Sequence, residues 1–240
     1  MAELTVHHRR RLRDVWRSAG WPCRDPLEIE LLAAGLLERH VDDQGRETLH
    51  VSDAGVAALA ATLEQNRRVR DAHEELVART ALHMHRSGRW VWRGLGVRAP
   101  LAASSAGDGA AAGLTASATR WVIAMPDLFS VRNTTVEAYL EPVIHEIKVR
   151  RGDLLADVRR ADKRAAYLAL TGECWYVLKE GIGSPDDVPA ECGVMIATAT
   201  AFEVLRPAPR REARLAFPTW MALARAARCD FGDDDAQAML

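Results

Sequence analysis

The chain contains very little lysine, and arginine supplies most of its positive charge. Of 32 basic residues among 240, only Lys148, Lys163 and Lys179 are lysines. A lysine that falls beside two acids in consecutive strands is therefore improbable on composition alone. The formal net charge of −1 excludes a global attraction to nucleic acid. Any such affinity must come from local basic patches.

Several common motifs are also absent. The four cysteines lie far apart without a CxxC pair, which excludes a zinc knuckle or a disulfide framework and is typical of reduced thiols. There is no HExxH motif, and no stretch approaches the roughly 20 uncharged apolar residues of a membrane span. The first residues lack the apolar core of a signal peptide. We therefore expect a cytoplasmic protein with no membrane contact.

The first part of the chain, residues 1–66, predicts a small domain. Its patterns predict helices over 5–19 and 26–37, a hairpin over 37–51 and a further helix after Ser52. This order resembles a winged-helix domain. Residues 26–37 contain no basic side chain, whereas a DNA-reading helix presents arginine, lysine or asparagine to the bases. We expect this domain to form a homodimer, to bind a protein partner or to contact phosphates only.

The larger part, residues 67–230, predicts an α/β domain. A long helix ending at Gly88 precedes a set of strands and helices. We expect strands near 89–98, 120–131, 142–149, 174–178, 193–198 and 201–206, and helices near 66–87, 152–170 and 218–228. The Ala/Gly/Ser-rich segment 101–118 predicts a flexible loop, and residues 231–240 form an acidic tail.

Two acids and a lysine lie on neighbouring predicted strands. Asp127 follows an apolar run, and Glu146 and Lys148 share one face of the next strand because side chains alternate with a period of two. A carboxylate at the end of an apolar strand is costly to bury without a cationic partner. Two such carboxylates offer hard oxygen ligands to Mg²⁺, which can polarise a scissile phosphate and activate water. Lys148 could then orient that water or stabilise the developing charge.

The stretches Pro126-Asp127 and Glu146-Ile147-Lys148, within this order of elements, resemble the PD-(D/E)XK nuclease superfamily and in particular its bacterial DNA-repair-type members. The resemblance covers roughly residues 67–206 and implies a restriction-endonuclease-like mixed sheet flanked by helices. It implies Mg²⁺-dependent hydrolysis of DNA, with Mn²⁺ as an alternative ion. Asp127 and Glu146 would bind the metal together with the carbonyl of Ile147, and Lys148 would be the catalytic lysine.

The chain also departs from that pattern. A polar insertion, residues 132–137, lies between the two acids. Many members use a further acid from the first helix, and here Glu74 and Glu75 are both available. We take Glu74 as the catalytic candidate, although the sequence does not choose between them.

Basic residues follow the motif, and they allow two interpretations. Phosphate contacts would come from Arg150, Arg151, Arg159, Arg160 and Lys163. The same residues would form a solvated face if the neighbouring aspartates balance them. The function that we expect is a Mg²⁺-dependent deoxyribonuclease. The alternative is an inactive nuclease-fold accessory protein in which Lys148 makes only a salt bridge, and RNA or branched DNA stays open as the substrate.

Overall fold

The computed structural model describes residues 4–18, 20–102 and 119–231. The chain divides into two compact units, residues 1–71 and 72–240, where the sequence pattern placed a boundary at 66/67. The division falls inside one helix, α3 (Asp53–Arg86). The two helices expected on either side of Asn66 are therefore a single helix, because no glycine or proline interrupts residues 56–86.

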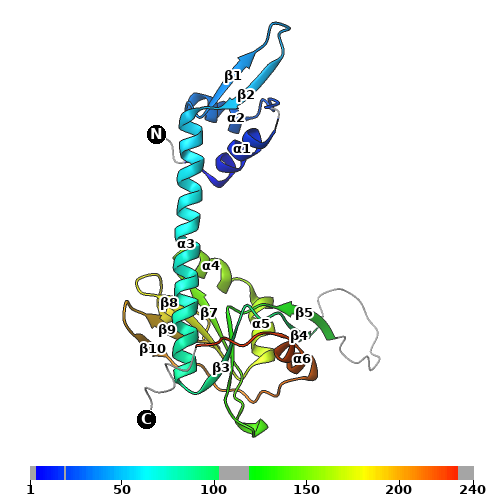
Figure 1. Ribbon diagram of the computed structural model, residues 1–240, viewed down its shortest axis with the longest axis vertical. Coiled ribbons are helices and arrows are strands. Elements are labelled where there is room, and N and C mark those ends of the chain that lie inside the picture. Colours follow the sequence, from blue (N-terminus) through cyan, green and yellow to red (C-terminus); the bar gives the residue numbers. More distant parts are fainter. Residues whose placement is uncertain (1–3, 19, 103–118, 232–240) are drawn as a thin grey trace, which may run out of the picture. The chain divides into compact units, whose positions relative to one another are not determined.

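The N-terminal unit packs short helices against a hairpin (Figure 1). Its buried cluster is formed by Leu12, Val15, Leu31, Leu36, Leu37 and Leu49. Gly20 adopts φ +77°, and a Cβ there would lie 2.3 Å from the Leu49 carbonyl oxygen. This position therefore needs glycine for both conformation and space. Besides the start of α3, the elements are α1 (Val6–Arg17), α2 (Pro26–Ala33), β1 (Leu37–Val41) and β2 (Glu47–Val51).

The C-terminal unit is built on a mixed six-stranded sheet, which confirms the α/β expectation. The strand order is β10-β9-β8-β7-β6-β3; β7, β8 and β9 run parallel, and the other neighbours are antiparallel. Strands β4 and β5 form a separate antiparallel pair. The elements are β3 (Arg89–Arg93), β4 (Val97–Ala102), β5 (Thr119–Ala124), β6 (Leu128–Arg132), β7 (Val143–Lys148), α4 (Arg151–Val158), α5 (Ala161–Leu170), β8 (Glu173–Lys179), β9 (Gly193–Ala197), β10 (Phe202–Arg206) and α6 (Phe217–Arg225), with short 3₁₀ helices at Glu137–Tyr139 and Pro185–Asp187.

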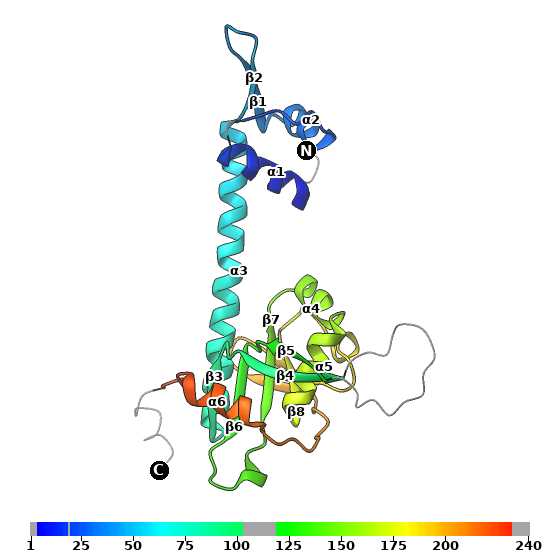
Figure 2. The same ribbon diagram turned by 90° about the vertical axis from the view of Figure 1, so that its right-hand side faces the viewer.

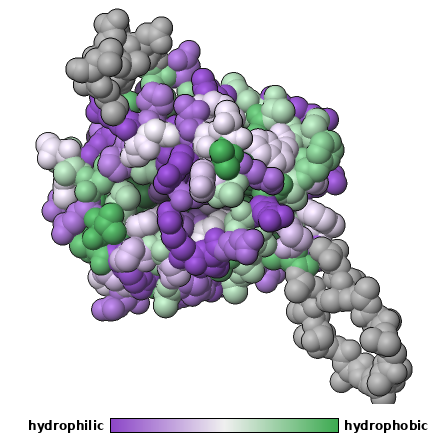
Figure 3. Space-filling model, turned by 90° about the horizontal axis from the view of Figure 1, so that it is seen from below, coloured by the Kyte–Doolittle hydropathy of each residue, from purple (hydrophilic) through white to green (hydrophobic). Residues whose placement is uncertain are grey.

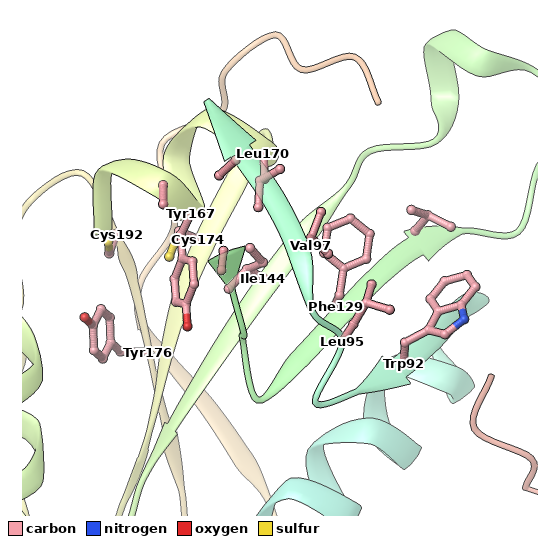
Figure 4. Close-up of a cluster of buried hydrophobic side chains, with 14 of the residues drawn as sticks. Trp92, Leu95, Val97, Phe129, Ile144, Tyr167, Leu170, Cys174, Tyr176 and Cys192 are labelled. Carbon is pink, nitrogen blue, oxygen red and sulfur yellow. The ribbon is translucent and has the colours of Figure 1, made fainter. Parts of the chain in front are cut away.

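The two faces of this sheet are covered by different elements (Figures 1 and 2). The second half of α3 packs on one face, where its Leu76 and Val77 meet Ile147 and Val177. The other face packs against α5, α6 and the β4–β5 pair. Figure 4 shows this second cluster, which extends from Trp92 to Tyr176. Because side chains alternate along a strand, Ile147 faces α3 while Ile144 faces α5.

Three predicted elements are interrupted. The Gly94-Leu95-Gly96 run predicts a break in the strand expected over 89–98, and β3 does end before Gly94, whose φ is +57°. The strand expected over 120–131 breaks around Pro126, which has no N–H to donate to a neighbouring strand. The helix expected over 152–170 is two helices that meet at residues 159–160, where no glycine or proline marks the break. The expected loop falls almost entirely on residues 103–118 and the acidic tail on residues 232–240, which lie outside the described residues.

Among the described residues, no helix is both long and apolar enough to cross a membrane. Figure 3 shows one face of the molecule, where hydrophilic residues predominate and hydrophobic residues form smaller separate patches.

Candidate functional site

Asp127 lies between β5 and β6 and faces the end of β7. Its Oδ2 accepts a hydrogen bond from the Ile147 backbone N–H at 2.7 Å, and His73 Nε2 of α3 lies 3.5 Å from the same oxygen. Its side chain is 22% exposed, and its Oδ1 has no hydrogen-bond partner among the described residues. Burial raises the pKa of Asp127, but the hydrogen bonds from His73 and Ile147 outweigh burial and hold this pKa below its ordinary value.

The Asp127 carboxylate takes the place of a strand partner. Pairing of β6 with β7 runs only from Leu128↔His145 to Ser130↔Val143, so Ile147 lies beyond the end of that ladder. Its N–H needs an acceptor, and Asp127 provides one. Within a β-strand the N–H and C=O of one residue point to the same edge. The Ile147 carbonyl therefore faces the edge on which Asp127 lies.

Glu146 is buried and fully engaged by protein groups. Its side chain is 4% exposed. Oε1 binds the ammonium groups of Lys148 at 2.6 Å and Lys163 at 2.5 Å, and Oε2 lies 3.0 Å from the Tyr167 hydroxyl. The contact with Lys148 confirms that the two residues share one face of β7. Lys163 comes from the first turn of α5.

Asp157 of α4 completes this arrangement. Its Oδ1 lies 2.6 Å from Lys163 Nζ and 3.7 Å from Lys148 Nζ, and its Oδ2 accepts a hydrogen bond from the Tyr176 hydroxyl at 2.9 Å. We call Glu146, Asp157, Lys148 and Lys163 the lysine–acid cluster. It contains two carboxylates and two ammonium groups, so its formal charge is zero. Burial of charge is tolerated when each charge is paired in this way.

The pKa values in this region reflect these pairings. For Asp157, burial raises the pKa, but the Lys163 hydrogen bond and the charge of Lys148 outweigh burial. The pKa of Asp157 is therefore below its ordinary value. For Lys163, burial lowers the pKa, and the charge of Glu146 with the bond to Asp157 raises it above the ordinary value. Burial raises the pKa of Tyr167 and of Tyr176. Both phenols therefore stay protonated and can donate to the carboxylates.

The two candidate helix acids differ in their surroundings. Glu74 forms an ion pair with Arg93 at 2.8 Å and lies 3.5 Å from His73 Nδ1. Since His73 also contacts Asp127, the imidazole links the two acids. Glu75 lines a different pocket, of about 380 Å³, together with Arg79, Lys179 and other residues. Of the two acids, Glu74 alone is connected to Asp127 through contacts of the described residues.

The five predicted nucleic-acid-binding residues separate into groups. Arg151 is held by Asp187 through two hydrogen bonds of 2.8 and 2.9 Å. Lys163 belongs to the lysine–acid cluster. Arg150 is exposed just before α4. Arg159 and Arg160 are exposed where α4 and α5 meet, and with Lys163 they line a pocket of about 790 Å³.

Sequence reasoning missed several parts of the site. His73 belongs to no recognisable motif. Asp157 was considered only as one of the aspartates that balance the neighbouring basic residues. The apolar strand expected over 174–178 indicates a core position for Tyr176, which its burial bears out, but its hydroxyl also donates a hydrogen bond to Asp157. The scarcity of lysine was an available signal, because it applies to Lys163 as much as to Lys148. The break between α4 and α5, which brings Lys163 to Glu146 of β7, was not predicted from the sequence.

The hydrogen bonding of the buried residue His145 differs from the prediction. It lies on the α3 side of the sheet, opposite Glu146, as expected, and it is buried. The alternation along the strand predicts a hydrogen-bonded core histidine at this position, but Nδ1 has no hydrogen-bond partner in the described structure. Burial lowers the pKa of His145 to about 3, so this side chain is neutral near pH 7.

The oxygen groups of this region have the chemistry that a magnesium site requires. Within the described residues, no three His, Cys, Asp or Glu side chains converge to hold a metal ion. A site here must therefore combine the carboxylates of Asp127 and Glu146 with the Ile147 carbonyl and water. These are hard oxygens, as Mg²⁺ requires. Asp127 has an oxygen available, whereas Glu146 would have to exchange Lys163 for the ion.

Comparisons with known proteins add little. No protein-family model matches the chain, and no curated protein matches it. A solved structure of a protein of unknown function from Silicibacter pomeroyi is similar to it at 19% identity, covering 67% of this chain and 83% of that one, with a TM-score of 0.37. So weak a similarity supports no inference about fold family or function.

Proposed function

We propose that the C-terminal unit is a metal-dependent nuclease of the PD-(D/E)XK type that hydrolyses phosphodiester bonds in DNA. The observation that carries this proposal is the end of the antiparallel β6–β7 pair at which β6 begins and β7 finishes. There the Asp127 carboxylate binds the backbone of Ile147, and the flanking residues Glu146 and Lys148 contact each other on one face. This end of the two neighbouring strands thus provides an acid, a second acid, a lysine and a carbonyl group that faces Asp127.

The order of elements also supports a restriction-endonuclease-like fold. Helix α3 is followed by β3, β6 and β7 in antiparallel sequence, then by α4 and α5, and then by β8 parallel to β7. This is the order of helix, motif-bearing strands, helix and strand that the resemblance implies. In the N-terminal unit, the helices and hairpin likewise support a winged-helix-like accessory domain. We assign it contacts with phosphates or with a protein partner.

The roles of the residues follow from their surroundings. A bound Mg²⁺ would supply a Lewis acid and an activated water. Asp127, Glu146 and the Ile147 carbonyl are the groups that would hold it. Lys148 lies beside Glu146, where its ammonium group can stabilise negative charge on a phosphoryl oxygen. Tyr167 fixes the orientation of Glu146 through a 3.0 Å hydrogen bond.

One observation favours the second candidate, an accessory protein without catalytic activity. Both oxygens of Glu146 already have partners, and the lysine–acid cluster is neutral without any bound ion. In an accessory protein these pairs would only neutralise buried charge, and Lys148 would have no part in catalysis. The two candidates therefore differ in whether Lys148 serves turnover.

A cleavage assay separates them. Wild type, Lys148→Met and Asp127→Asn would be incubated with Mg²⁺ and single-stranded, duplex or branched DNA, or with RNA. We expect cleavage by wild type and a loss of about 10²–10³-fold in kcat for Lys148→Met, the usual effect of removing one group that stabilises the transition state. Lys179→Met, which changes the third lysine outside the cluster, is the matched control and should retain full activity.

Circular dichroism of each variant would show whether the fold is kept. If wild type and Lys148→Met are equally inactive on every substrate, the accessory protein is the better account.

A further inference from the structure

Helix α1 of the N-terminal unit has two sides of different character (Figure 1). One side faces the rest of the unit, and its Leu12 is fully buried in the apolar cluster. On the same side, His8 lies 2.6 Å from Glu30 of α2, and Arg11 forms an ion pair with Asp25, the N-cap of α2. The polar groups on this side of α1 therefore have partners within the unit.

The opposite side of α1 carries Arg10, Arg13 and Arg17. Residues spaced by three and seven positions share one face of a helix, because 3.6 residues complete a turn. All three residues are exposed, and within the described part of the chain none of them forms an ion pair. Arg13 donates a hydrogen bond to the Arg9 carbonyl oxygen at 3.3 Å. We call Arg10, Arg13 and Arg17 the α1 arginine stripe, which extends about 10 Å at 1.5 Å per residue.

Other exposed arginines of the N-terminal unit differ from the stripe because they are paired with acids. These pairs are Arg39 with Glu47 at 3.5 Å, Arg46 with Asp42 at 2.6 Å, and Arg68 with Glu64 at 3.1 Å. The sequence of α1 contains one acid, Asp14, which lies beside the stripe and forms no ion pair with it in the described structure. Three positive charges and one negative charge leave this side of α1 with a formal charge of +2.

We infer that the α1 arginine stripe binds the phosphate backbone of duplex DNA. Arginine suits phosphate because its charge and its N–H donors act on the same oxygens. Phosphates follow one strand of a duplex at a rise of about 3.4 Å, so a stripe of about 10 Å matches about three of them. This inference selects one of the two partners proposed for the N-terminal unit, and it rests on the proposal that the protein acts on DNA.

The surroundings of α1 argue against a membrane surface and against reading of bases. An amphipathic helix enters a membrane surface through its apolar side, but the apolar side of α1 is already buried against Leu31 of α2 and Leu49 of β2. Helix α2 contains no basic or amide side chain that could read base edges. We therefore expect binding that does not depend on DNA sequence.

A single strand is the competing nucleic-acid partner. Trp16 is 61% exposed and lies beside the stripe, where it offers a stacking surface to unpaired bases. The stripe itself contains no aromatic residue, and its fixed spacing matches the regular phosphates of a duplex. We therefore expect the duplex to bind more tightly than the single strand.

The test is fluorescence anisotropy with the full chain and labelled duplexes of roughly 20 base pairs, about two helical turns, in EDTA so that no cleavage occurs. Two duplexes of unrelated sequence should bind with affinities that agree within about twofold. Alanine at all three stripe positions should weaken binding about tenfold or more. It should also lower the slope of log K against log salt by about 2.7, since each phosphate contact contributes about 0.9. Lysine at the same positions should keep most of the slope, because it conserves the charge.

The matched control replaces three arginines that have acid partners, Arg39, Arg46 and Arg68, by alanine. This variant loses the same number of positive charges from the same unit. Its slope should fall by less than about 0.9, the contribution of one phosphate contact. Circular dichroism of both triple variants shows whether their helix content is kept.

Four results would overturn the inference. The first is an equal loss of binding in the stripe and control variants, and the second is a strong preference for one of the two duplex sequences. The third is a single strand that binds more tightly than the duplex and is weakened by Trp16→Ala. The fourth is binding of phosphatidylserine vesicles, or of polyglutamate, through the stripe as tightly as the duplex at equal charge concentration.

The nuclease proposal fails in a different way. A protein that binds duplex through the stripe but never cleaves DNA with Mg²⁺ refutes the nuclease and keeps the inference. A protein that cleaves DNA, but binds duplex in EDTA equally well with and without the stripe, refutes the inference alone.

Discussion

The two acids of the candidate site lie in contrasting regions. Asp127 is at the edge of the sheet, partly exposed, and is satisfied by a backbone N–H and an imidazole. Glu146 is inside, 4% exposed, and is satisfied by two ammonium groups and a phenol. Neutral or weakly charged donors are sufficient where water can still reach a carboxylate. Where it cannot, full charges are required.

The contrast indicates which of the two carboxylates can bind a metal ion more easily. Among the described residues, Asp127 Oδ1 has no hydrogen-bond partner, so Asp127 can accept a cation without losing a contact. Glu146 is held in a neutral cluster, and it can accept a cation only if Lys163 withdraws. If the site binds a metal, Asp127 is thus the primary ligand and Lys163 is the competitor. The following predictions test each half of the comparison, beginning with the largest effect.

Removing the interior acid should have the largest effect on stability. Glu146→Ala leaves Lys148 and Lys163 with Asp157 as their only remaining acid in the cluster. Removing one partner of a buried ion pair costs about 3–5 kcal/mol. The free energy of unfolding, measured in urea, should therefore fall by that amount. Glu137→Ala, at an exposed acid, should change it by less than about 0.5 kcal/mol. Equal effects in the two variants would show that the cluster does not stabilise the fold.

Removing the competitor should increase the affinity for metal. Lys163→Met keeps the aliphatic stem and removes the positive charge next to Glu146. Taking one like charge away from a cation site should raise Mg²⁺ affinity about tenfold, measured by isothermal titration calorimetry. Lys179→Met supplies the control. Unchanged or weaker binding in Lys163→Met would mean that Glu146 is not a ligand.

The edge acid should make a smaller and pH-dependent contribution. The hydrogen bond to Asp127 raises the pKa of His73 above 6.5, so its stabilising effect is complete below pH 6.5 and is lost as pH rises through the higher folded-state pKa. Hydrogen bonding lowers the pKa of Asp127 below 3.8, so its effect is present above that pH and is lost as pH falls through the folded-state pKa. The pair therefore stabilises most between about pH 4 and 6.5.

We expect His73→Ala to lower the free energy of unfolding by about 0.5–1 kcal/mol at pH 5.5 and by clearly less at pH 8.5. Denaturant unfolding at the two pH values measures this difference. His7→Ala, at an exposed position of α1, should show the same small effect at both. A His73→Ala effect that does not depend on pH would remove the ionic contact with Asp127 from the account.

Sequence patterns predicted the order of strands and helices well, because apolar alternation and glycine positions are local signals. They also placed Glu146 beside Lys148, since the period of two fixes that relation within one strand. They did not predict that Lys163 would reach back to Glu146, or that His73 would reach Asp127. Those contacts depend on how α5 and α3 pack on the sheet. The break at residues 159–160, which sets the start of α5, has no sequence signal.

The most direct test of the account is calorimetric titration of Mg²⁺ into wild type, Asp127→Asn and Glu146→Gln. Both substitutions conserve shape and remove one charge. The account predicts a saturable Mg²⁺ site in wild type and at least tenfold weaker binding in each variant, with the larger loss in Asp127→Asn because Asp127 is the ready ligand. Absence of binding in wild type, or identical binding in all three proteins, would contradict it and leave the two acids as purely structural groups.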